Sequence, residues 1–471
     1  FYQNNNGREG MIVWLDALAI RAFGTEPWAL RLFPAIAGVL AVLGLYFLTR
    51  ELFRVETALV SSFFMATSFW SVNFSRIGFR AGLMVPILIW SFYFLVRGFT
   101  KTPEVGLRVF WWLNFVLGGI LFGLGFYTYI SHRFTPILIA AFFIPYLIKR
   151  RVKNLWMGFV IFVVVAFVVA LPIGLYFLNN LGDFFGRSGQ VSIFSADNPL
   201  RAAALSIVTT LGMFNVIGDF NWRHNFSGSP QLFWPVGILF LLGIYLSIKE
   251  FSFSEKFLLL WFFIFLLPNI LTTESNPHAL RSLSAMPAAM IFAGIGLVWL
   301  YKKFQGYLDE NLKNQKFTKF QVQLLRIKKE IFWLLIVFLI FIAGSEFNKY
   351  FNLWAFNPNV AGAFSQSQFR IADYLNNLPK ETEKYTIWDA SDRATNNGLP
   401  VSAQTVYFLT TEKTKINYLK SDELDKIKMG ENGTVVAPLY FNLYLLHNLI
   451  KQFPQRKINF IYINTAVVAV P

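Results

Sequence analysis

The sequence contains no cysteine, only four histidines and few charged residues. The lack of cysteine excludes disulfides, thiolate metal sites and cysteine nucleophiles. The histidines at positions 132, 224, 278 and 447 are scattered, and no carboxylates cluster, so neither a metal site nor another cofactor is expected. Charged residues make up 14% of the 471 residues, against about 25% in a soluble protein, and 55% are hydrophobic. The chain is therefore predicted to be an α-helical polytopic membrane protein.

Long apolar runs predict about ten membrane spans, each close to the roughly 20 residues that cross a bilayer. Ahead of them, residues 1–27 are expected to form an amphipathic helix in the interface plane, since Trp14 and Leu18 recur at helical spacing while Asp16 and Arg21 interrupt the apolar run. The chain begins at Phe1 rather than Met, with no visible signal peptide, and we expect a first span to precede it. The expected spans are residues 28–49, 57–75, 81–98, 110–130, 134–148, 156–178, 233–249, 256–272, 282–301 and 331–346.

The formal net charge of +16 is unevenly placed along the chain. Lys and Arg concentrate in alternate loops, most heavily in residues 302–330, and the positive-inside rule makes those loops cytoplasmic. The charge therefore predicts orientation rather than nucleic-acid binding. The loops with unusual polar residues then lie on the outer face: residues 1–27, 75–81, 131–133, 179–232 and 272–281.

Residues 347–471 have a mixed polar and apolar composition and predict a small soluble α/β domain on the outer face. Helical spacing at 369–378 and 439–453 alternates with strand-like segments at 385–388, 415–419, 434–437 and 457–463. Such alternation favours a mostly parallel sheet. The predicted domains are the interfacial helix 1–27, a transmembrane domain 28–346 with the outer loop 179–232, and the α/β domain 347–471.

The outer loop at residues 272–281 holds the densest group of candidate site residues. Asn276 and Pro277 are sufficient to make its turn, so Glu274, His278 and Arg281 are more than the turn requires. If residues 277–281 begin the next helix, His278 and Arg281 share a face near its positive end, where an anionic phosphate binds favourably. The alternative is that both side chains anchor lipid head groups.

Arginines on the other outer loops extend this set. Arg76 and Arg80 lie between two spans against the positive-inside bias, and their forked donors fit a phosphate, although head-group anchoring is again the alternative. His132 and Arg133 form a weaker candidate, and Arg8 precedes the amphipathic helix. The long loop 179–232 contains an expected helix at 199–217 together with Asp219, Arg223 and His224, and its length and aromatic content favour an ordered lid. Together these loops predict a pocket for a lipid-tethered anion such as a polyprenyl phosphate or pyrophosphate, where neutralising the phosphate assists its departure from a sugar carbon.

The segment around Trp28 resembles a known motif. Residues 28–38 are similar to the "W-x-x-R-L-P-A-x-x-G" opening of the second span in polytopic glycosyltransferases, and residues 7–24 fit the interfacial helix before it. These are the dolichyl-phosphate-mannose protein mannosyltransferases and lipid A aminoarabinose transferases of the GT-C superfamily. Residues 74–86 and 277–281 are similar to bacterial members. The resemblance extends from residue 1 to about residue 300.

The resemblance implies an integral protein of a bacterial inner membrane with its site on the extracytoplasmic face. A sugar would pass from a polyprenyl-phosphate donor to a protein, lipid or glycan acceptor. Arg8, Arg76, Arg80, His132, Arg133, His278 and Arg281 would bind the donor. Glu274 is the catalytic candidate. Relatives place their catalytic acidic residue in a loop that this chain does not include, and Arg80 stands where they often have a second acid. This fragment is therefore expected to lack the main catalytic acid.

Two other readings stay open. A flippase or transporter of a lipid-linked glycan would show internal repeats and charged or broken helices at mid-membrane. The sequence shows no repeat, and its spans carry almost no acidic residues at their centres. A non-catalytic assembly subunit would use the C-terminal domain for interaction.

Overall fold

The computed structural model describes residues 9–101, 108–313, 319–392, 395–396, 398–440, 442–462 and 465–470. The chain forms two compact units. The first comprises Phe1–Ala19 and Leu30–Trp354, and the second comprises Ile20–Ala29 and Ala355–Pro471. The sequence placed the start of the C-terminal domain at residue 347. In the structure the last long helix continues as a π-helix through Trp354, and the second unit resumes at Ala355.

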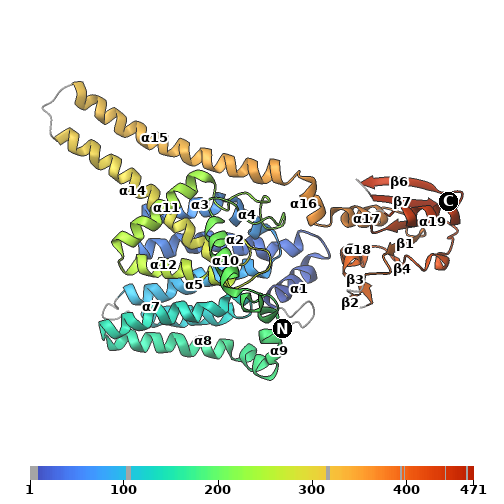
Figure 1. The fold of residues 1–471 in the computed structure, drawn as a ribbon, viewed down its shortest axis with the longest axis horizontal. Helices are drawn as coiled ribbons and strands as arrows, with labels where there is room; N and C mark the ends of the chain where they lie inside the picture. The colour runs from blue at the N-terminus through green and yellow to red at the C-terminus, as the bar shows by residue number, and fades with distance from the viewer. Residues whose placement is uncertain are drawn as a thin grey trace. The chain divides into compact units, whose positions relative to one another are not determined.

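The first unit is built from helices that run side by side (Figure 1). In this unit α1, α4 and α10 gather toward one end, and the C-terminal end of α14 lies at the other end. The helices are α1 Met11–Phe23, α2 Ala29–Leu52, α3 Val55–Thr67, α4 Phe69–Arg76, α5 Arg80–Thr100, α6 Arg108–Gly125, η1 Ile130–Phe134, α7 Thr135–Arg150, α8 Lys153–Asn179, α9 Leu181–Gln190, η2 Ile193–Ser195, α10 Pro199–Gly212, α11 Trp234–Glu250, α12 Phe253–Ile264, α13 Leu267–Ile270, η3 Leu283–Ala285, α14 Met286–Lys313, α15 Lys319–Phe347 and η4 Asn348–Trp354.

Seven helices of the described residues are long and apolar enough to cross a membrane, and each coincides with an expected span. Two further expected spans correspond to the shorter apolar helices Val55–Thr67 and Trp111–Gly125, and α11 occupies the last. The prediction of a polytopic helical membrane protein is thus confirmed. The seven are Ala29–Leu52, Arg80–Thr100, Ile130–Arg150, Lys153–Asn179, Phe253–Ile270, Leu283–Glu310 and Glu330–Trp354.

The expected helix at 57–75 is two helices in the structure. α3 ends at Thr67, and Ser68 has an extended backbone (φ −61°, ψ 133°) before α4 begins at Phe69. Because an extended ψ interrupts the helical hydrogen-bond ladder, α4 is free to take its own direction. The chain therefore reaches Arg76 through a separate short helix.

Close packing of α11 against α14 brings two loops together. A Cβ added to Gly243 would lie 1.8 Å from the carbonyl oxygen of Phe292, and one added to Gly296 would lie 2.2 Å from that of Leu239. Small residues permit this approach of two backbones, as is common between membrane helices. Since α11 and α14 begin on the same side, the loops that precede them, residues 213–233 and 271–285, become neighbours.

The interfacial helix α1 has apolar side chains on more than one side. Ile12 and Ala19 are buried, whereas Trp14 and Leu18 are exposed. Exposed aromatic and aliphatic side chains on a helix outside the bundle suit burial at the head-group boundary of a bilayer. The interfacial position of the segment stays a prediction.

The second unit contains a five-stranded sheet in the order β4-β1-β5-β7-β6. β1 pairs in parallel with β4 and β5, but β7 pairs antiparallel with both β5 and β6. The expectation of a mostly parallel sheet is therefore wrong for one half, because the last strand, β7, which the sequence analysis missed, pairs antiparallel with both of its neighbours. The strands are β1 Glu383–Trp388, β2 Thr395–Asn396, β3 Leu399–Pro400, β4 Asn417–Lys420, β5 Thr434–Pro438, β6 Lys457–Tyr462 and β7 Thr465–Val470.

Helices cover both faces of this sheet. Ile371 of α17 and Val406 of α18 pack with Val435 on one face. Leu445 and Leu449 of α19 pack with the other. The alternation of buried residues along β5 places neighbouring valines in opposite cores. The prediction of a C-terminal α/β domain is therefore confirmed. The helices are α16 Pro358–Ala363, α17 Gln366–Asn376, η5 Val401–Ala403, α18 Gln404–Thr410, η6 Leu424–Lys426 and α19 Leu443–Gln452.

Candidate functional site

The loop at residues 272–281 is closed by Arg281. Its guanidinium donates to Thr272 Oγ1 at 2.8 Å and to the carbonyl of Glu274, and its Nη2 lies 3.1 Å from Glu274 Oε2. Arg281 is 9% exposed, while the Glu274 side chain is 48% exposed. These bonds hold residues 277–281 in turns, so the proposed early start of the next helix is wrong: η3 begins at Leu283 and α14 at Met286.

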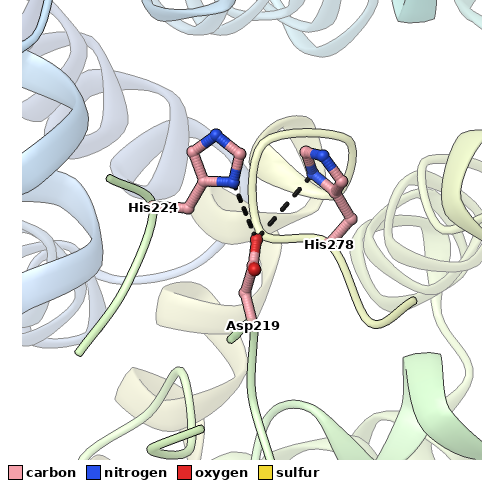
Figure 2. Close-up of side chains that lie close together, drawn as sticks. All are labelled: Asp219, His224 and His278. Atoms are coloured by element: carbon pink, nitrogen blue, oxygen red, sulfur yellow. Dashed lines mark hydrogen bonds and ion pairs between the residues drawn. The ribbon is translucent and has the colours of Figure 1, made fainter. Parts of the chain in front are cut away.

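His278 of the same loop faces Asp219 and His224 of the long loop 179–232 (Figure 2). Asp219 Oδ2 lies 2.9 Å from His224 Nδ1 and 3.9 Å from His278 Nδ1. The two imidazole centroids are 4.7 Å apart. Asp219 and His224 are buried, and the His278 side chain is 13% exposed. The structure thus joins a predicted site residue to two residues that the sequence analysis placed only in a lid.

Backbone donors fix the Asp219 carboxylate in this orientation. Oδ2 accepts the Ala279 N–H at 2.8 Å, and Oδ1 accepts the Asn221 N–H at 2.8 Å. Burial pushes the pKa of Asp219 upward, but the hydrogen bond and charge of His224, with smaller contributions from His278 and Asn221, outweigh it, and the pKa lies below its ordinary value. The carboxylate is therefore ionised at neutral pH and bridges the two loops.

The chain around Asp219 folds into a tight loop that only small residues permit. A Cβ at Gly218 would lie 2.1 Å from the Ser229 carbonyl oxygen, and Gly228 has a positive φ of 73°. Asn225 Nδ2 donates to the carbonyls of Asp219 (3.1 Å) and Ser229 (2.6 Å). These contacts fix the positions of Asp219 and His224 before any ligand binds.

Aromatic rings connect this cluster to the predicted site at 75–80. The His224 ring stacks on Phe74 at 5.9 Å between centroids and meets the edge of Phe79 at 5.5 Å. Asn73 Nδ2 donates to the Arg223 carbonyl at 2.9 Å. Phe74 of α4 and Phe79 of the loop between α4 and α5 therefore form one apolar wall of the Asp219 cluster.

A second charged group surrounds Glu9. Its carboxylate, 4% exposed, pairs with Arg80, which stacks over the Tyr129 ring at 5.2 Å. Arg133 interacts electrostatically with both Glu9 and Arg80. Its guanidinium also lies over the rings of Phe184 (3.9 Å) and Phe177 (5.0 Å). One guanidinium group thus pairs with the buried carboxylate and a second interacts with it electrostatically, so the three groups together carry a net positive charge.

The other predicted residues lie apart from both groups. Arg76 is exposed and lies over the rings of Tyr350 (5.7 Å) and Phe351 (5.3 Å) of η4. His132 is fully buried, with Nε2 2.9 Å from the Phe122 carbonyl oxygen and Nδ1 3.2 Å from Thr135 Oγ1. Arg8 lies outside the described residues.

Asp219, His224 and His278 are the residues that could hold a metal ion among those described, because one ligand atom of each lies within 4.8 Å of the others. The sequence analysis expected no metal, since the histidines are scattered. The spacing of Asp219 and His224 within one aromatic-rich loop was the only local signal. His278 joins them through packing of α11 on α14, which hydropathy does not reveal.

Comparison with known proteins relates this fold to a family. Residues 10–176 match the family of dolichyl-phosphate-mannose-protein mannosyltransferases. ArnT from Cupriavidus metallidurans bound to undecaprenyl phosphate superposes with a TM-score of 0.54 at 14% identity, covering 98% of this chain and 88% of ArnT. The chain has the fold of the GT-C membrane glycosyltransferases. The resemblance first seen at residues 28–38 is therefore confirmed.

A second ArnT structure gives the same fold. ArnT in the apo state superposes with a TM-score of 0.54 at 15% identity, covering 97% of this chain and 86% of ArnT. The archaeal oligosaccharyltransferase AglB from Archaeoglobus fulgidus, in complex with an inhibitory peptide and a dolichol-phosphate, reaches 0.48 at 15% identity, covering 98% and 66% of the two chains. No curated protein sequence matches the chain.

Proposed function

We propose that this GT-C protein transfers a sugar from a polyprenyl-phosphate carrier to a protein, lipid or glycan acceptor on the extracytoplasmic face of a bacterial inner membrane. The observation that carries the proposal is the superposition of 98% of the chain on ArnT bound to undecaprenyl phosphate. The match of residues 10–176 to a mannosyltransferase family supports the same reaction class. The orientation rests on the basic loops, which the positive-inside rule assigns to the cytoplasm.

The carrier phosphate binds at the Glu9, Arg80 and Arg133 group in this proposal. Among the described residues, the Glu9 carboxylate pairs with Arg80 and also attracts Arg133. Guanidinium forks match phosphate oxygens. The rings of Tyr129, Phe177 and Phe184 hold the arginine planes. Positive charge fixed in place stabilises the phosphate as it leaves the sugar carbon, without reorganisation of the site.

The acceptor side of the site is proposed to involve Glu274. Its carboxylate is half exposed and held by Arg281, so it can accept a hydrogen bond from an acceptor hydroxyl without moving. His278 and Arg281 shape this loop. Arg76 is proposed to contact the carrier at the membrane face, where it is exposed.

The experiment measures label transfer from radiolabelled polyprenyl-phosphate sugars in membranes that contain the full-length protein. Arg80→Ala and Arg133→Ala are compared with the matched control Arg150→Ala. Arg150 is the last residue of α7, at the opposite end of that helix from η1, which contains Arg133. We expect transfer to fall at least about tenfold in the first two variants and to be unchanged in the control. Transfer that is equal in all three would refute the phosphate site. Carrier translocation without transfer by the wild-type protein would refute the proposed reaction.

A further inference from the structure

We propose that Asp219, His224 and His278 form a binding site for a divalent transition-metal ion of the zinc class. The three residues come from two loops that adjoin α11 and α14, and all are largely buried. Two imidazole nitrogens and one carboxylate oxygen are a donor set that favours zinc-class ions over Mg²⁺ or Ca²⁺, which prefer oxygen ligands.

The distances fit a tetrahedral ion. With metal–ligand bonds of about 2.0–2.1 Å, neighbouring ligand atoms in a tetrahedron lie about 3.3 Å apart. The observed separations from Asp219 Oδ2 are 2.9 Å to His224 Nδ1 and 3.9 Å to His278 Nδ1, on either side of that value. Shifts of about half an ångström therefore bring each of these two nitrogens to the tetrahedral separation from Asp219 Oδ2, and all three ligand residues offer atoms within 4.8 Å of one another.

Contacts behind the ligands already hold them in place. The N–H groups of Asn221 and Ala279 bond to the two oxygens of Asp219, so that Oδ2 points between the imidazoles (Figure 2). The rings of Phe74 and Phe79 restrict the His224 imidazole from the other side. Outer contacts of this kind orient metal ligands and raise affinity.

The ion would give the cluster a chemical role that hydrogen bonds do not provide. Three protein ligands leave one tetrahedral position for an oxygen ligand such as water or a phosphate oxygen. The ion's two positive charges exceed the single charge of Asp219, so the site would attract an anion. It would also lock the 213–233 loop to the 271–285 loop. The site is argued from its own ligands and does not depend on the proposed sugar transfer.

The competing explanation is a purely hydrogen-bonded hub. In that case His224 Nδ1–H donates to Asp219 Oδ2 and no ion enters, a geometry that 2.9 Å also allows. Metal content separates the two explanations. Full-length protein is purified in detergent through a tag without histidine, dialysed against Zn²⁺, desalted and analysed by inductively coupled plasma mass spectrometry.

We expect about one Zn²⁺ per chain in the wild-type protein, and at least about tenfold less in His278→Ala and His224→Ala. His447→Ala is the matched control, because His447 is exposed on α19 outside the cluster, and it should keep the wild-type content. Excess Mg²⁺ should not displace the ion. Equal zinc content in wild type and in both cluster variants, or no zinc in the wild type, would overturn the proposal.

Replacing one proposed metal ligand by cysteine tests the site through a signal that is gained, rather than through a loss of bound zinc. The chain has no cysteine, so His278→Cys introduces the only thiol. With Co²⁺ added, we expect a thiolate-to-cobalt charge-transfer band in the near ultraviolet, together with tetrahedral d–d bands, and Zn²⁺ should slow alkylation of the thiol at least about tenfold. His447→Cys should show neither effect. A folded His278→Cys protein that lacks the band and is alkylated at the same rate with and without Zn²⁺ would also overturn the proposal.

Discussion

The charge balance around Glu9 leads to an ordered prediction for carrier affinity. In the wild-type protein Glu9 offsets one of the two guanidinium groups of Arg80 and Arg133, which leaves a net charge of about +1. Glu9→Gln raises that charge by one, and Arg80→Gln lowers it by one. The double variant restores the wild-type charge. If charge decides binding, undecaprenyl phosphate binds most tightly to Glu9→Gln, equally to wild type and double variant, and most weakly to Arg80→Gln.

The expected magnitude follows from the burial of the pair. The Arg80 and Glu9 side chains are 18% and 4% exposed, so an effective dielectric constant of about 20–40 applies. One unit of charge at about 6 Å from a phosphate is then worth about 1.5–3 kcal/mol. This corresponds to a change of about 10–100-fold in Kd for each step.

The assay is binding of labelled undecaprenyl phosphate to the protein in nanodiscs of neutral lipid, with thermal unfolding recorded for every variant. Arg80→Gln leaves the Glu9 carboxylate with less compensation, and we expect a stability loss of about 3–5 kcal/mol that the double variant largely removes. A double variant that is stable but binds as weakly as Arg80→Gln would refute the charge argument. It would mean instead that Arg80 holds the phosphate directly.

Three further changes test other parts of the structure. Gly243→Ala should destabilise the protein by about 3 kcal/mol or more, because its Cβ would meet the Phe292 carbonyl at 1.8 Å, whereas Gly174→Ala, with nothing within 4 Å, should not lower the unfolding temperature. Arg281→Lys should speed amide hydrogen exchange in residues 272–281 about tenfold or more, since the forked bonds that close the loop are lost; unchanged exchange would show that the loop is held by other contacts. Burial raises the pKa of Asp16 from 3.8 to about 6, so its ionisation opposes folding above that range, and the penalty disappears as pH falls below 3.8. Asp16→Asn should therefore raise the unfolding temperature at about pH 7.5 and not at about pH 4, and equal temperatures at pH 7.5 would contradict the burial of this carboxyl.

Much of the candidate site was visible in the sequence as a set of loops but not as contacts. The 272–281 loop was identified because a short polar stretch between two apolar runs is expected to be a loop at the membrane face. The sequence did not show that Arg281 would turn back onto Thr272 and Glu274. Which groups the Arg281 guanidinium bonds to depends on distances within the folded loop, and residue types alone do not specify those distances.

The separation between Arg76 and Arg80 is a second example. Four residues apart, they were treated as one phosphate clamp. In the structure Arg76 lies over Tyr350 and Phe351, while Arg80 pairs with Glu9. Arg76 is the last residue of α4 and Arg80 is the first residue of α5, so the two side chains belong to different helices and have different partners.

The sequence by itself determined the membrane class, the positions of the spans and the separate α/β domain, because hydropathy and local periodicity depend on neighbouring residues alone. It also determined that polar chemistry concentrates in one set of loops. The tertiary structure alone decided which loops meet. Asp219 and His224 lie beside His278 in loops that precede α11 and α14, two helices whose glycines permit backbone contact. β7 pairs antiparallel with β5, a pairing between segments about 30 residues apart. Such contacts join residues far apart along the chain, and their energies are set by packing rather than by local pattern.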